Sequence, residues 1–308
     1  MDLCVTIRND AAMGHQNNTS RLGNVNRRLA LAASFSMILN SRMSWGAAEK
    51  TIQFGLTPVF LTSDIELLTR LKSYLTRKCA TEVQLVQRRT YEEITGLLLS
   101  GQLDAAWICG YPFVQYRSEL ALVAVPEWRG KPLYRSYIIV HSERNAASID
   151  NLKGDLHAFS DPNSNSGYLV TAALLAEQNQ KPESFFKKTI FTYGHRNVVR
   201  AVASGLAQSG SVDGYVWEVM AELEPELTSK TRVLRKSEEL GFPPVACLRS
   251  DRNAPPIVLL RQALLDMAKD SEGREVLNLL KLDGFSEMPE SLFDLIAAKM
   301  NLVRNGKT

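Results

Sequence analysis

The amino-acid sequence predicts an α/β fold organised as two lobes. Short apolar runs alternate with amphipathic segments of roughly ten to fifteen residues, which is the pattern of βαβ units and a parallel sheet. The chain has 308 residues, of which 45% are hydrophobic and 22% are charged. A chain of this length and composition can bury two cores, so an ordinary globular protein with two lobes is expected.

Residues 1–48 are predicted to be a secretory leader. Arg27 and Arg28 precede an apolar run at residues 29–39, and small residues at 46–48 follow it just before Glu49. A basic segment, an apolar segment and small residues in this order are typical of a signal that is removed after export. An amphipathic first helix of the fold is the alternative. No later apolar run approaches the ~20 residues needed to span a bilayer, so no stable membrane insertion is expected once the leader is removed.

The charge balance argues against a nucleic-acid partner. The net charge of +3 comes from 36 basic and 33 acidic residues, and five arginines and two aspartates of these lie in residues 1–48. The rest of the chain has 31 residues of each sign. A neutral body lacks the basic surface that nucleic-acid binding requires.

The cysteines and histidines show no metal-binding pattern. Cys4, Cys79, Cys109 and Cys247 lack the spacing of a ligand motif, and the four histidines lack it as well. The last three cysteines stand among apolar neighbours and are predicted to be buried thiols, although a disulfide between two of them after export stays open. No metal or cofactor is expected.

The first lobe is predicted to begin with residues 49–141. Strands are expected at 51–56, 83–87, 104–108 and 133–140, with helices that begin near residues 63 and 91 and a loop at 110–113. Ligands of parallel sheets bind beyond the carboxyl ends of the strands. Thr57, Tyr91 and Tyr111 are therefore expected near one rim.

The second lobe is predicted to comprise residues 142–242. Strands are expected at 156–159 and 188–191, a strand and turn at 211–217, and a last strand at 231–234; helices are expected at 168–176 and 198–203. The chain then crosses back at 240–246. Residues 243–308 return to the first lobe with helices at 257–269 and 273–280, followed by a tail at 291–302.

A small polar turn at residues 160–167 has the composition of an anion site. It joins an apolar strand to a helix and contains Ser164, Asn165, Ser166 and Gly167. Helix N-termini leave free main-chain N–H groups and a partial positive charge, the side chains can donate to the same oxyanion, and glycine allows close approach. The alternative is an ordinary helix N-cap with an Asx turn, because the same residue types are preferred there.

The order of the motifs resembles the PhnD-like family of phosphate and phosphonate receptors of ABC importers. The resemblance covers roughly residues 50 to 300. The segments that match the family are residues 90–94, 101–107, 160–170, 194–205 and 212–217. The turn at 160–167 is the most specific of them.

The resemblance implies a type II-like periplasmic-binding-protein fold whose two lobes are joined by two crossing strands that act as a hinge. It implies a phosphorus oxyanion held in the cleft by the turn at Ser164, Asn165 and Ser166, by Tyr91 and Tyr134, and by His195, which could add a proton if the site raises its pKa. It also implies an ABC permease as partner and a periplasmic location.

The sequence departs from the pattern of aminoethylphosphonate receptors. Tyr215 and Pro243 stand where those receptors have two acidic side chains for the ligand ammonium, and Asp213 is the nearest substitute. The expected ligand is therefore phosphate, phosphite or a small phosphonate without an amine. A binding protein that presents its closed form to a membrane kinase is an alternative. A hydrolase using Ser166, His195 and Asp213 is disfavoured, because the turn lacks a Gly-x-Ser-x-Gly elbow.

Overall fold

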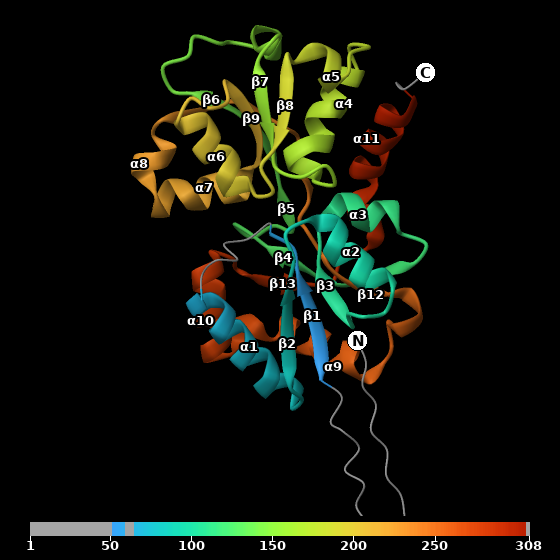
Figure 1. The fold of residues 1–308 in the computed structure, drawn as a ribbon. Coiled ribbons are helices and arrows are strands. Elements are labelled where there is room, and N and C mark those ends of the chain that lie inside the picture. The colour runs from blue at the N-terminus through green and yellow to red at the C-terminus, as the bar shows by residue number, and fades with distance from the viewer. Residues whose placement is uncertain (1–50, 59–64, 306–308) are drawn as a thin grey trace, which may run out of the picture. The chain divides into compact units, whose positions relative to one another are not determined.

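The computed structural model describes residues 51–58 and 65–305, which form two lobes (Figure 1). The predicted leader, 1–48, lies outside the described residues. Each lobe is built on its own mixed sheet, one with six strands and one with five. The predicted two-lobed α/β architecture is confirmed.

The sheet of the first lobe has the strand order β13-β4-β12-β3-β1-β2. Strand β1 pairs in parallel with β2 and β3, whereas β12 runs antiparallel to β3 and β4. The strands are β1 (Ile52–Leu56), β2 (Val83–Gln87), β3 (Ala105–Trp107), β4 (Leu120–Glu127), β12 (Val245–Leu248) and β13 (Gly284–Ser286). The helices of this lobe are α1 (Ile65–Cys79), α2 (Tyr91–Leu99), α3 (Gly110–Gln115), α9 (Pro255–Leu265) and α10 (Ser271–Leu280).

The sheet of the second lobe has the strand order β10-β6-β9-β7-β8. Strand β7 pairs in parallel with β8 and β9, and β6 runs antiparallel to β9 and β10. The strands are β6 (Ser136–His141), β7 (Leu156–Phe159), β8 (Lys188–Phe191), β9 (Ser209–Asp213) and β10 (Thr231–Lys236). The helices are α4 (Val170–Ala176), α5 (Pro182–Phe185), α6 (His195–Ala203), α7 (Gly214–Leu223) and α8 (Pro225–Thr228).

Two short strands connect the lobes. β5 (Leu133–Tyr134) and β11 (Leu240–Gly241) pair antiparallel, with Leu240 opposite Tyr134. The single strand expected at 133–140 is divided at Arg135, because β6 belongs to the sheet of the second lobe. The chain therefore passes from one sheet to the other at Arg135, whereas the sequence indicated residue 141.

Several segments expected to be irregular are helical. Residues 110–113 belong to α3, where Pro112 occupies the first turn and loses no helical hydrogen bond. Residues 214–217 begin α7, which Asp213 caps. The C-terminal tail is helix α11 (Asp294–Asn305), which packs against α3 of the first lobe and α4 of the second (Figure 1). Strands β4 and β13 were not expected from the sequence, and short 3₁₀ turns lie at Ile149–Leu152, Arg249–Asp251, Met267–Lys269 and Glu290–Phe293.

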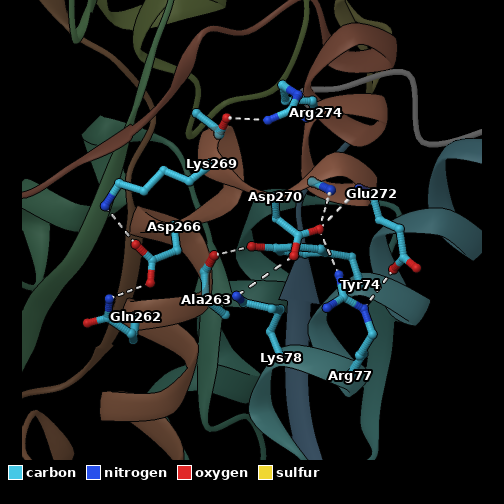
Figure 2. A network of polar contacts seen from close by, with 12 residues as sticks. Tyr74, Arg77, Lys78, Gln262, Ala263, Asp266, Lys269, Asp270, Glu272 and Arg274 are labelled. Carbon is cyan, nitrogen blue, oxygen red and sulfur yellow. Dashed lines mark hydrogen bonds and ion pairs between the residues drawn. The ribbon is translucent and has the colours of Figure 1, made fainter.

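A polar network fixes α1 against the C-terminal helices of the first lobe (Figure 2). The buried Tyr74 hydroxyl donates to the Ala263 carbonyl at 2.6 Å. Arg77 donates to Asp270 at 2.7 Å and to Glu272 at 2.9 Å. Asp270 also accepts the first main-chain N–H groups of α10, so the same carboxylate caps one helix and holds another. The arrangement joins α1 to both α9 and α10.

A substitution at Gly210 tests how tightly the second lobe is packed. A Cβ there would lie 2.6 Å from Val198 Cγ1 and 3.2 Å from the Ala158 carbonyl. Gly210→Ala should therefore lower the free energy of unfolding by about 1–3 kcal/mol through overpacking. The matched control is Gly96→Ala in α2, where a Cβ meets nothing within 4 Å, and it should raise that free energy by about 0.5–1 kcal/mol. Urea unfolding of both variants checks this, and equal effects would contradict it.

Candidate functional site

The anion turn follows β7 and leads directly into helix. The helical conformation begins with a π-helical turn, Asn165–Leu169, and continues as α4, so the helix starts earlier than the expected residue 168. Ser164 is the N-cap, and its hydroxyl accepts the Gly167 main-chain N–H at 2.9 Å. The capping role and an anion-binding role are compatible, because the Ser164 hydroxyl proton remains a donor.

Gly167 is required by the space around it. A Cβ at this position would lie 1.9 Å from Ser160 Oγ and 3.0 Å from His195 Cε1. Any side chain would displace the groups that surround the turn. This is the close approach that the sequence analysis expected of the glycine.

Residues of both lobes meet at the turn through hydrogen bonds. Asn165 Nδ2 donates to Tyr134 Oη at 2.9 Å, and the Asn165 main-chain N–H donates to Cys109 Sγ at 3.2 Å. Tyr91 Oη lies 3.2 Å from His195 Nε2, and the Tyr91 main-chain N–H donates to Asp161 Oδ2 at 3.2 Å. The structure thus brings together Tyr91, Tyr134, Asn165 and His195, as expected from the sequence.

Local structure places Tyr91 at the site. It is the first residue of α2, whose N-terminus is held by a reciprocal capping box between Thr90 and Glu93. Its side chain is 1% exposed, although the neighbouring residues of the first turn face solvent. The cap therefore fixes the point at which this hydroxyl reaches the second lobe.

His195 is a neutral donor. Its Nδ1 accepts the Asp213 main-chain N–H at 3.0 Å, so the neutral ring carries its proton on Nε2, which faces Tyr91 Oη. Burial lowers the pKa of His195 to about 3. The sequence analysis expected His195 to add a proton only if the site raised its pKa, and burial lowers that pKa instead.

Asp213 lies beside Ser166 of the turn and is the N-cap of α7. Its Oδ1 accepts the main-chain N–H groups of Tyr215 at 2.9 Å and Val216 at 3.3 Å. Its Oδ2 lies 3.5 Å from the Ser166 hydroxyl, which is at the limit of hydrogen bonding. Burial raises the pKa of Asp213 to about 7.

Tyr215 has a different role from the expected ligand contact. Its hydroxyl donates to the Leu280 carbonyl at the end of α10, and its ring packs against Trp128 and Phe242. Tyr215 stands in the first turn of α7, and through these contacts its side chain joins that helix to the first lobe. It is not one of the groups that the structure gathers at the turn.

Three residues of the site were missed in the sequence. Cys109 is the second residue after β3, so the rule that ligands lie beyond strand ends could have indicated it. Asp161 accepts main-chain N–H groups of Asn163 and Tyr91. Ser160 is fully buried, and its hydroxyl has no hydrogen-bond partner among the described residues, a property that only the fold reveals.

The arrangement suits a bound anion better than catalysis. The hydroxyls, amide, imidazole and main-chain N–H groups around the turn are uncharged donors. His195 bonds to Tyr91 and to the Asp213 main chain rather than to the Ser166 hydroxyl, which is not the geometry of a hydrolase triad. No group of three metal-binding side chains occurs within 51–58 and 65–305. None of the helices in these ranges is both long and apolar enough to cross a bilayer.

The protonation state of His195 can be tested directly. The ring should remain neutral from about pH 5 to pH 8 with its proton on Nε2, because burial disfavours the charged form. Two-bond ¹H–¹⁵N spectra of the histidines check this, with His195→Gln to assign the signal. A titration midpoint near the ordinary value of about 6.5 would show that His195 is not held neutral by burial.

Comparisons with known proteins identify the family and the fold. Residues 54–293 match the family described as the phosphonate ABC transporter periplasmic substrate-binding protein. PhnD1 from Prochlorococcus marinus in complex with methylphosphonate is similar in structure, with a TM-score of 0.75, 19% identity and coverage of 83% of this chain and 99% of that one.

Two further solved structures share the fold. A binding protein component of an ABC phosphonate transporter from Pseudomonas aeruginosa has a TM-score of 0.75, 20% identity and coverage of 84% of this chain and 88% of that one. The alkanesulfonate-binding protein SsuA from Xanthomonas axonopodis pv. citri, bound to MOPS, has a TM-score of 0.59, 17% identity and coverage of 85% and 95%. With the family match over most of its length, this chain belongs to the phosphonate-binding periplasmic substrate-binding proteins of ABC transporters, which are receptors.

Proposed function

We propose that this protein is the periplasmic receptor of an ABC importer for phosphate, phosphite or a small phosphonate without an amine. One observation supports this most strongly. Neutral hydrogen-bond donors from both lobes converge on the N-terminus of a helix, around Asn165, Ser166 and His195. Such donors can satisfy an oxyanion without a permanent countercharge.

The two-lobed contacts support binding by hinge closure. Tyr91 belongs to the first lobe and Tyr134 to a crossing strand, whereas Ser166 and His195 belong to the second lobe. An oxyanion touching all four would bind the closed form far better than an open one. Ligand therefore shifts the population toward the closed form, which docks on the permease.

The two positions where aminoethylphosphonate receptors have acidic side chains, Tyr215 and Pro243, favour a ligand without an ammonium group. Tyr215 is engaged with Leu280, and the Pro243 carbonyl accepts the Trp107 indole N–H at 2.9 Å. Neither position offers a carboxylate. Phosphate, phosphite and methylphosphonate are therefore the expected ligands, and the family's periplasmic location agrees with a leader at 1–48.

A panel of ligands tests the substrate class. Protein beginning at Glu49 is heated with phosphate, phosphite, methylphosphonate, aminoethylphosphonate or sulfate, and a sample without ligand is the control. A ligand at about 100 times its dissociation constant should add about 2.7 kcal/mol to the stability. One of the first three should give the largest upward shift. A preference for aminoethylphosphonate would overturn the proposed ligand class.

Single substitutions test whether residues of both lobes bind the ligand. Tyr91→Phe and Ser166→Ala should each weaken binding about 10- to 100-fold, because each removes a hydrogen bond to a charged group. The matched control is Tyr74→Phe, which removes a buried hydroxyl bonded to Ala263 and should lower stability but not affinity. Calorimetric titration measures all three. Unchanged affinity in both site variants would refute the proposal.

A further inference from the structure

Asp213 is a buried acidic side chain beside Ser166 of the anion turn. It is 1% exposed and forms no ion pair with any residue in 51–58 or 65–305. One carboxylate oxygen is fully used by the cap of α7. The other, Oδ2, has the Ser166 hydroxyl as its single described hydrogen-bond partner, at 3.5 Å. The carboxylate therefore keeps acceptor capacity beside a serine expected to hold the ligand.

Among the residues that the structure describes, no cation pairs with this carboxylate. The Arg135 guanidinium on the adjoining segment is engaged with the Ser237 carbonyl and with Glu239, and its own carbonyl accepts the Gly214 N–H. The titratable groups around Asp213 are His195 from α6, Tyr91 from α2, Cys109 before α3, Tyr134 from β5 and Tyr215 from α7, with Asp161 farther along the turn. All but Asp161 are neutral when buried at neutral pH.

We propose that Asp213 Oδ2 accepts a hydrogen bond from an acidic hydroxyl of the ligand, so that the receptor selects oxyanions that still bear a proton. This inference rests on the proposed function. A phosphonate or phosphite loses its last acidic proton near neutral pH and phosphate keeps one well above neutral pH, whereas a sulfonate or sulfate has none to share. The selected class is therefore phosphorus oxyanions, and sulfur oxyanions of the same shape are rejected.

The selection follows from the cost of burying like charges. A sulfonate oxygen would place lone pairs against the Asp213 carboxylate with no hydrogen between them, in a site without a cation. With a phosphonate, one proton lies between a ligand oxygen and Asp213 Oδ2, whichever of the two oxygens holds it. Burial raises the pKa of Asp213 to about 7, so the carboxyl can also provide that proton to a dianion. No bond other than that to the shared proton changes.

The test compares methylphosphonate with methanesulfonate in Asp213→Asn and the parent protein. Calorimetric titrations are made at several pH values. The parent should bind methylphosphonate at least about 100-fold more tightly, and its affinity should fall by about tenfold per pH unit once both free partners are ionised, since binding then takes up one proton.

Asp213→Asn should keep the cap of α7, because asparagine is also a good N-cap, and should present an amide donor in place of Oδ2. The preference for methylphosphonate should fall by at least about tenfold, methanesulfonate should bind more tightly, and the pH dependence should flatten. The matched control is Asp161→Asn, which removes the same formal charge where both oxygens accept main-chain N–H groups. It should affect both ligands alike and leave their ratio unchanged.

The outcomes separate this inference from the proposed function. Equal affinity of the parent for the two anions, or an unchanged ratio in Asp213→Asn, overturns the role of Asp213 and leaves the receptor function standing. Failure of the parent to bind any phosphorus oxyanion overturns the proposed function and this inference with it. A preference for aminoethylphosphonate that Asp213→Asn abolishes would assign the carboxylate to an ammonium group instead, and would also overturn the inference.

Discussion

The structure depends on a set of hydrogen bonds that neutral groups share across two lobes. Tyr91 meets His195, and Asn165 meets both Tyr134 and Cys109. Each partner is buried, so each polar group must find its hydrogen bond within the protein or in a ligand. In this structure these groups satisfy one another, and an oxyanion bound among them would replace some of these hydrogen bonds with its own. Binding and the contact between the lobes therefore depend on the same groups.

The topology explains why these groups meet. In both sheets the parallel strands end at the edge that faces the turn, and the chain passes between the sheets through β5 and β11. Tyr134 lies on β5 itself. A side chain that contacts the anion turn therefore belongs to the segment that must bend when the lobes move, which couples ligand contact to the hinge.

Contacts away from the turn also join the lobes. Helix α11 packs against α4, and Tyr215 of α7 donates to the Leu280 carbonyl. Glu218 of α7 pairs with Arg129 from the connection between β4 and β5 at 2.9 Å. These contacts lie on elements that the anion turn does not include. In this structure they join the two lobes by contacts other than those at the anion turn.

The sequence alone determined the alternation of strands and helices, the anion turn and the need for Gly167, because periodicity, capping and glycine geometry are local properties. The family resemblance that the order of the motifs carries implied one site for Tyr91, Tyr134 and His195. Only the tertiary structure decided that His195 is neutral and that Tyr215 faces α10. It also decided that Cys109 contacts the turn, that Ser160 is buried within it, and that the chain passes from one lobe to the other at Arg135. These features depend on burial and on partners distant in the chain, and a local pattern holds no information about either.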